Sequence, residues 1–98
     1  LEDIYFAVSK ESVDYIRTKW MHSTQIELDE ESQSFFRNKY PTLKEFTFFS
    51  IECRENPELY SKFASYTGSV VLLEPVFMRD KLASRIERGQ QLYNPPEN

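Results

Sequence analysis

Few residues in this chain have the side chains that catalysis usually needs. His22 is the only histidine and Cys53 the only cysteine among 98 residues. A zinc site would need several His, Cys or carboxylate ligands at suitable spacing, and neither a Cys-x-x-Cys nor a His-x-x-x-His pattern occurs. With two glycines, Gly68 and Gly89, the chain cannot form a glycine-rich phosphate loop. We therefore expect no enzyme activity, no metal and no cofactor.

Two other groups have both a chemical and a structural interpretation. Cys53 could be a nucleophile, but that role needs a neighbouring base and an electropositive pocket. A lone thiol in a strand-like segment is typically a small buried hydrophobe. The acidic run of Glu27, Asp29, Glu30 and Glu31 is typical of a solvated turn, with a cation site as the alternative.

Local signals divide the chain into strands and helices. Asn56 can cap a helix that begins at Pro57, and Gly68 supplies the left-handed residue that ends it. The residues after Gly68 form a short β-branched run, typical of a strand buried on both faces. The periodicity of apolar residues predicts the remaining elements. The full order is strand 4–8, helix 10–20, strand 25–29, strand 44–52, helix 57–67, strand 69–74 and helix 75–93, the last with Met78, Leu82, Ile86 and Tyr93 on one stripe.

The pattern of apolar residues is clear in the first helix and the second strand, and it is unclear in residues 30–43. The first helix should bury Val13, Ile16 and Trp20, which recur at i, i+3 and i+7. The strand over residues 25–29 alternates apolar and polar residues, as strands at a sheet edge often do. Residues 30–43 lack a clear period, and we expect a long, partly ordered connection there.

This order of elements predicts an α+β fold, a ferredoxin-like βαββαβ sandwich with an extra C-terminal helix. A single domain would occupy residues 1–93, followed by a polar tail over residues 94–98. Right-handed crossovers place the first two helices on one face of the sheet. The opposite face would carry Tyr5, Phe46 and Phe48, and the last helix or a partner would have to cover it. We expect these three rings to form an interface.

An alternative interpretation of the same rings is nucleic-acid binding. Residues 44–51, which include Phe46 and Phe48, loosely resemble the aromatic third strand of RNA-recognition domains, whose rings stack on bases. A free-standing domain that binds single-stranded nucleic acid is therefore the second hypothesis. The segment lacks the glycines of that motif, and the net charge of −4 has the wrong sign for such a binder.

Charge and hydropathy exclude two further classes of protein. A net charge of −4 without a basic tail leaves no electrostatic surface for duplex DNA. No apolar run reaches the length of a membrane span, and no signal peptide is recognisable. We expect a soluble, cytoplasmic domain without membrane contact. The start at Leu1 and the proline-rich end favour a piece of a longer protein.

Two segments contain a distinctive order of motifs. Residues 58–82 hold a helix, a stop at Gly68, a strand that ends in Leu-Glu-Pro and a helix with an early Arg79. Residues 15–25 hold an Ile-Arg pair followed by His-Ser-Thr-Gln. Together these segments resemble the C-terminal extension, called WCX, of WYL-domain transcriptional regulators. The second segment is similar to the Leu-Arg and His-x-Ser-Gln motifs of Bacteroides-type members.

The resemblance implies a non-catalytic domain for regulation, ligand sensing and dimerisation. The parent protein would be a homodimer with an N-terminal helix-turn-helix and a central SH3-like WYL domain as partners in the same chain. Such extensions often help to bind a nucleotide or single-stranded nucleic acid as effector. With this resemblance we expect effector contacts at Arg17, His22 and Arg79, since guanidinium groups suit phosphate or carboxylate. The alternative for each arginine is an exposed, solubilising charge.

Overall fold

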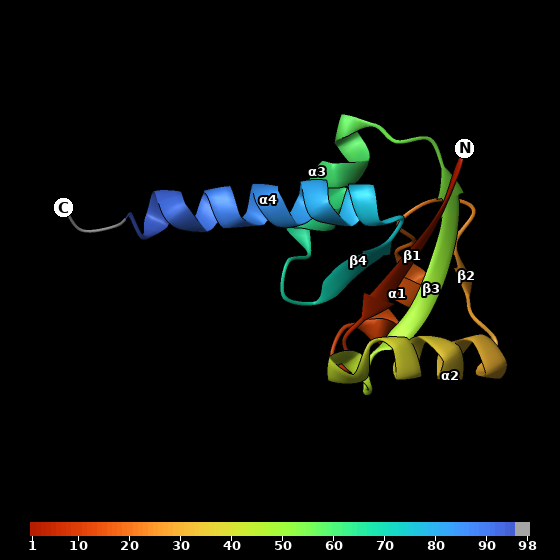
Figure 1. Ribbon diagram of the computed structural model, residues 1–98. Helices are drawn as coiled ribbons and strands as arrows, with labels where there is room; N and C mark the ends of the chain where they lie inside the picture. The colour runs from red at the N-terminus through yellow and green to blue at the C-terminus, as the bar shows by residue number, and fades with distance from the viewer. Residues whose placement is uncertain (96–98) are drawn as a thin grey trace.

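A computed structural model describes residues 1–95 (Figure 1). Four strands form one antiparallel sheet in the order β2-β3-β1-β4. They are β1 (Glu2–Val8), β2 (Ile26–Glu27), β3 (Thr47–Cys53) and β4 (Val70–Glu74). The α-helices within residues 1–95 are α1 (Val13–Thr18), α2 (Glu30–Lys39), α3 (Pro57–Ser65) and α4 (Val76–Tyr93), and a 3-10 turn, Pro41–Leu43, follows α2. The predicted α+β class is confirmed.

The ends of α3 follow from the local signals that predict it. Asn56 Oδ1 accepts a hydrogen bond of 2.9 Å from the Leu59 N–H and so caps the first turn. Gly68 has a φ of +95°, a conformation that residues with a Cβ rarely adopt, and the chain turns there from α3 into β4. The predicted start at Pro57 is confirmed, and the helix ends at Ser65, slightly before the predicted end.

The sheet is apolar on both faces, as the residue pattern along β1 predicts. Ile4, Phe6 and Val8 are fully buried on the face that packs against α1, α3 and the first turns of α4. Ala7 and Phe48 are buried on the opposite face. Phe48 thus lies on the face predicted for it.

Residues 30–43 hold α2 and the turn Pro41–Leu43, which corrects the expected partly ordered connection. The apolar pattern of α2 is weak because Phe36 and the polar Gln33 are its two buried side chains. The signal that could have identified the helix lies at its start. Asp29 Oδ1 accepts a hydrogen bond of 2.9 Å from the Ser32 N–H, and glutamates fill the first turn, where the helix dipole favours negative charge.

The second face of the sheet is covered by α2, and not by the last helix or a partner as expected. Helix α4 instead begins on the α3 side, where Met78 and Leu82 are buried. Its C-terminal half then projects away from the sheet (Figure 1). Although α4 has 18 residues, neither it nor another helix within residues 1–95 is apolar enough to cross a membrane. Residues 96–98 of the predicted tail lie outside the described part of the chain.

Helix α1 is shorter than the helix predicted over residues 10–20, and this changes one core position. Trp20 lies beyond its end and is 54 % exposed, which corrects its expected place in the core. The Trp20 Nε1–H donates to the Arg17 carbonyl oxygen over 2.9 Å, and Met21 enters the core instead. Strand β2 is also shorter than predicted, but it lies at the sheet edge as expected.

Candidate functional site

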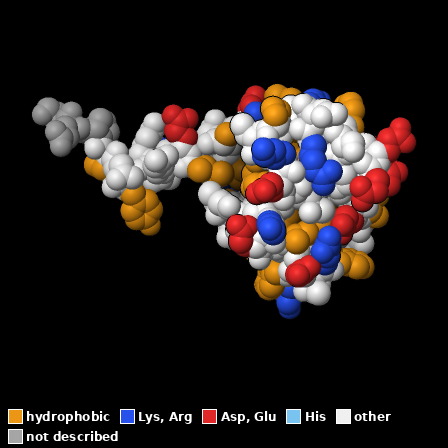
Figure 2. All heavy atoms as spheres, turned by 90° about the horizontal axis from the view of Figure 1, so that it is seen from below, with side chains coloured by type: hydrophobic (Ala, Val, Ile, Leu, Met, Phe, Trp, Pro, Cys, Tyr) orange, Lys and Arg blue, Asp and Glu red, His pale blue; other side chains and the backbone are white. Residues whose placement is uncertain are grey.

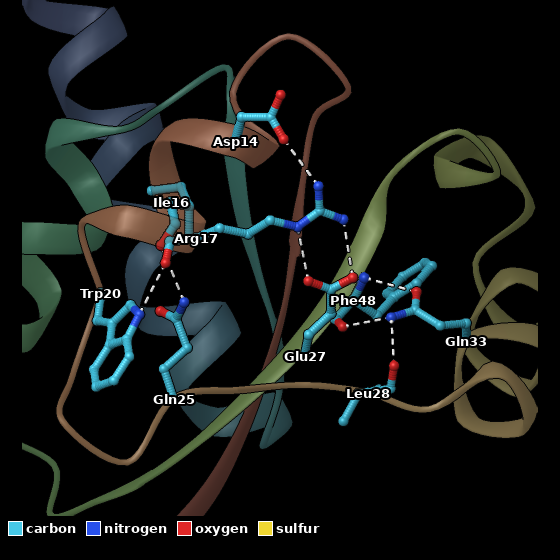
Figure 3. Close-up of polar contacts among 9 residues, drawn as sticks. All are labelled: Asp14, Ile16, Arg17, Trp20, Gln25, Glu27, Leu28, Gln33 and Phe48. Atoms are coloured by element: carbon cyan, nitrogen blue, oxygen red, sulfur yellow. Dashed lines mark hydrogen bonds and ion pairs between the residues drawn. The ribbon is translucent and has the colours of Figure 1, made fainter.

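Arg17 joins α1 to the edge strand β2 (Figure 3). Its Nε and Nη2 donate to the two carboxylate oxygens of Glu27 over 2.8 and 2.9 Å, and Nη1 donates to Asp14 over 2.9 Å. The hydrogen bonds from Arg17 lower the pKa of the Glu27 carboxyl. Because both edges of the guanidinium already bind carboxylates, this side chain holds two elements together and does not present a free fork to an effector.

His22 lies in the loop before β2 and is oriented by its neighbours. Its Nδ1 is 2.8 Å from Thr24 Oγ1, and the Thr24 hydroxyl also contacts the backbone of Glu52 in β3. His22 and Cys53 both line a pocket of about 350 Å³, and the Cys53 thiol donates to the Arg54 carbonyl oxygen. Within residues 1–95, no group of three His, Cys, Asp or Glu side chains is placed to hold a metal ion.

Arg79, in the first turn of α4, lies over the ring of Tyr40 with 5.9 Å between the guanidinium carbon and the ring centroid. The Tyr40 hydroxyl and Lys39 Nζ both donate to Glu74 Oε2, over 2.7 and 2.6 Å. Burial alone would raise the pKa of the Glu74 carboxyl, but these hydrogen bonds outweigh burial and lower it. This cluster ties the end of α2 to the junction between β4 and α4.

The three predicted effector residues do not form one site. Arg17 contacts β2, His22 lines the pocket beside Cys53, and Arg79 packs on Tyr40 at the end of α2. A single small effector bound by all three would need a different arrangement of these elements.

The three rings predicted as an interface lie under α2. Phe48 is 1 % exposed and stacks on Phe36 with 5.6 Å between ring centroids, and Tyr5 packs on the same ring at 5.1 Å. Phe46 is half-buried beside them. Because the unrecognised helix α2 covers Phe48, this ring is not available for the predicted interface with a partner. Viewed from the α2 side, the body carries interspersed basic and acidic side chains (Figure 2).

The end of α4 is one of the places where large apolar side chains are exposed. Leu92 is 66 % and Tyr93 90 % exposed, and Ile86 is 37 % exposed one turn beyond the buried part of the helix. Hydrophobic side chains are visible along this projecting segment in Figure 2. We call Leu82, Ile86, Gly89 and Tyr93, which share one helix face, the α4 stripe. Its first member is buried and its last is almost fully exposed.

An apolar groove of about 270 Å³ lies beside the α4 stripe, between α4 and the edge strand β4. Val70 and Leu72 line it from β4, and Leu82, Ala83 and Ile86 line it from α4. The sequence pattern places Ile86 and Tyr93 on one stripe with the core residues of α4. The pattern does not show that Ile86 lies at the margin of the folded body and that Tyr93 lies beyond it.

Comparisons of this chain with protein-family models, with curated proteins and with solved structures give no match. In the described part of the chain, the exposed end of α4 continues from an apolar groove that lies between α4 and β4.

Proposed function

We propose that this chain is a non-catalytic regulatory and dimerisation domain, the WCX extension of a WYL-type transcriptional regulator. The motifs behind this proposal fall on corresponding elements: α3, the stop at Gly68, β4 with its Leu-Glu-Pro end, and α4 with Arg79 in its first turn. In the parent protein the domain would follow a helix-turn-helix and a WYL domain. It would act in the cytoplasm and help to sense a nucleotide or single-stranded nucleic acid.

We infer a ferredoxin-like arrangement for the sheet and its crossover helices. The strand order β2-β3-β1-β4, with all pairs antiparallel, is compatible with a split βαβ unit in which α1 and α3 cross one face. In this interpretation α2 is an insertion between β2 and β3, and α4 is the extra C-terminal helix.

The observation that carries the dimerisation proposal is the exposed end of the α4 stripe. Its members are spaced by four, three and four residues, which is the spacing of the apolar positions in a coiled coil. A Cβ added at Gly89 would meet nothing within 4 Å, so packing within the chain gives no reason for a glycine there. Close approach of a second helix would give such a reason.

A second copy of this chain fits this stripe in an antiparallel arrangement. Ile86 of one copy would then oppose Gly89 of the other, and Tyr93 would reach Leu82, where the apolar groove opens. Because specific interfaces bury at least about 1,200 Å², both stripes and both grooves would have to take part in the contact. We therefore expect a reversible homodimer.

Sedimentation equilibrium of the wild-type chain and of Tyr93→Ser tests this proposal. Losing one large apolar side chain per copy should weaken the dimer at least tenfold, since each buried side chain contributes about 1.5–3 kcal/mol. Phe35→Ser is the control, because Phe35 is an exposed ring that lies on α2 and not on the α4 stripe. A wild-type chain that stays monomeric, or equal effects of both variants, would contradict dimerisation through α4.

The family part of the proposal has its own test. The reading frame upstream of Leu1 should encode a helix-turn-helix followed by an SH3-like WYL domain. A different upstream sequence would contradict the assignment to this family of regulators. Dimerisation would still be tested by sedimentation equilibrium.

A further inference from the structure

A second groove lies on the other side of α4, between that helix and α3. Its volume is about 510 Å³, within the range of small-molecule sites. Pro57 and Tyr60 line it from α3 as an apolar wall, and Ser61, Lys81 and Arg85 add polar groups. The sequence signal for this site is the i, i+4 spacing of Lys81 and Arg85. The position of α3 opposite them could not be read from that spacing.

Arg85 has unused hydrogen-bonding capacity in this groove. Its Nη1 donates to Ser61 Oγ over 3.2 Å. Within residues 1–95, no carboxylate oxygen lies within 4.0 Å of its guanidinium, in contrast to Arg17. A guanidinium has five N–H donors, and the Ser61 hydroxyl keeps its own hydrogen to donate. Arg85 and Ser61 therefore offer several hydrogen-bond donors to the groove, and neither side chain carries a negative charge.

Lys81 is held at the same groove by Glu55. Lys81 Nζ lies 2.6 Å from Glu55 Oε2, and the Tyr60 hydroxyl donates to the same oxygen. Both partners of the ion pair are solvent-accessible, with side-chain exposures of 60 % and 32 %, so the pair is exchangeable. Counting Lys81, Arg85 and Glu55, the groove carries a local charge of +1 in a chain whose net charge is −4.

We propose that the groove between α3 and α4 binds the phosphate group of a small phosphate monoester that also carries a flat apolar group. Arg85 and Ser61 would hold the phosphate through charge-assisted and hydroxyl hydrogen bonds, and Lys81 would turn toward it from Glu55. The apolar group would lie against Tyr60 and Pro57. The groove would be the effector-binding site of the proposed regulator, and in that respect the inference rests on the proposed function.

Titration of the isotope-labelled chain with phenyl phosphate, followed by NMR, tests the site. We expect saturable shifts of the Ser61 and Arg85 signals, and none with phenol. Arg85→Gln should weaken binding at least tenfold. Arg88→Gln is the matched control, because it removes the same charge one turn away and outside the groove. Glu55→Gln should tighten binding, since Lys81 loses its competing partner.

Each outcome of this titration decides the proposal. Absence of saturable shifts, or equal weakening by Arg85→Gln and Arg88→Gln, overturns it, because either result leaves only unspecific attraction between charges. Tighter binding of benzoate than of phenyl phosphate overturns the choice of a phosphate. The same titration on Tyr93→Ser separates this inference from dimerisation, since the groove should bind phenyl phosphate in the monomer as well.

Discussion

At the scale of single residues, Gln33 connects α2 to the backbone of β3. It is 4 % exposed, and its amide Nε2 donates to the carbonyl oxygens of Leu28 and Phe48 over 3.1 and 2.8 Å. Its Oε1 accepts from the Phe48 N–H over 2.9 Å, so one side chain replaces strand pairing where β2 ends (Figure 3). Sequence patterns do not reveal this role, because a polar residue inside a helix usually faces water.

Gln33→Leu should lower the free energy of unfolding by about 2–3 kcal/mol, because it leaves the buried Phe48 N–H without its partner. Urea denaturation measures the change, with Gln91→Leu on the exposed surface of α4 as the control. A loss for Gln33→Leu no larger than for the control would show that α2 does not depend on these hydrogen bonds.

The ion pair between Arg17 and Glu27 predicts a dependence of stability on pH. Because the folded-state pKa of Glu27 lies below its ordinary value of 4.5, the pair stabilises the fold above that value. The contribution is lost as the pH falls through the lowered pKa. Arg17→Gln should therefore lose less stability than the wild type when urea denaturation is repeated from neutral pH down to pH ~3. If the free energy of unfolding fell equally with pH in the two proteins, this role of Arg17 would be contradicted.

At the scale of elements, the two glycines should respond in opposite directions to the same substitution. Gly89→Ala should stabilise the projecting part of α4 by about 1 kcal/mol, because the added methyl group meets no atom and alanine favours helix. Gly68→Ala should lower stability, because its φ of +95° is strained for alanine. Hydrogen exchange of α4 amides at concentrations that favour the monomer, and urea denaturation, measure the two effects. Protection of α4 that is unchanged or reduced by Gly89→Ala would contradict the first expectation.

Elements with a local stop signal could be predicted from the sequence, and those shaped by distant contacts could not. The cap at Asn56 and the turn at Gly68 define α3 through contacts only a few residues away. Helix α2 shows little apolar periodicity because one of its two buried side chains is polar. Phe36 packs in the core, and Gln33 binds the backbone of β3. Because α1 already ends at Thr18, Met21 and not Trp20 is buried in the core. The spacing of apolar residues alone does not indicate this early end.

At the scale of the whole molecule, the missed helix changes where a partner can bind. The residue pattern correctly separates the two faces of the sheet, but a face that looked open is closed by α2. The candidate site could be predicted only in part, since spacing places Ile86 and Tyr93 on the α4 stripe without showing that Tyr93 lies beyond the folded body. Leu92 and Tyr93 are exposed at the end of α4, and hydrophobic side chains are visible along this projecting segment in Figure 2.

The central claim is that two copies of this chain pair through their α4 stripes. An NMR sample that mixes carbon-13-labelled and unlabelled chains detects contacts between copies alone. We predict intermolecular nuclear Overhauser effects from the Tyr93 ring to Leu82, and from Ile86 to the Gly89 α-hydrogens. A dimer without these contacts, or their absence at concentrations well above those used for sedimentation, would contradict the account.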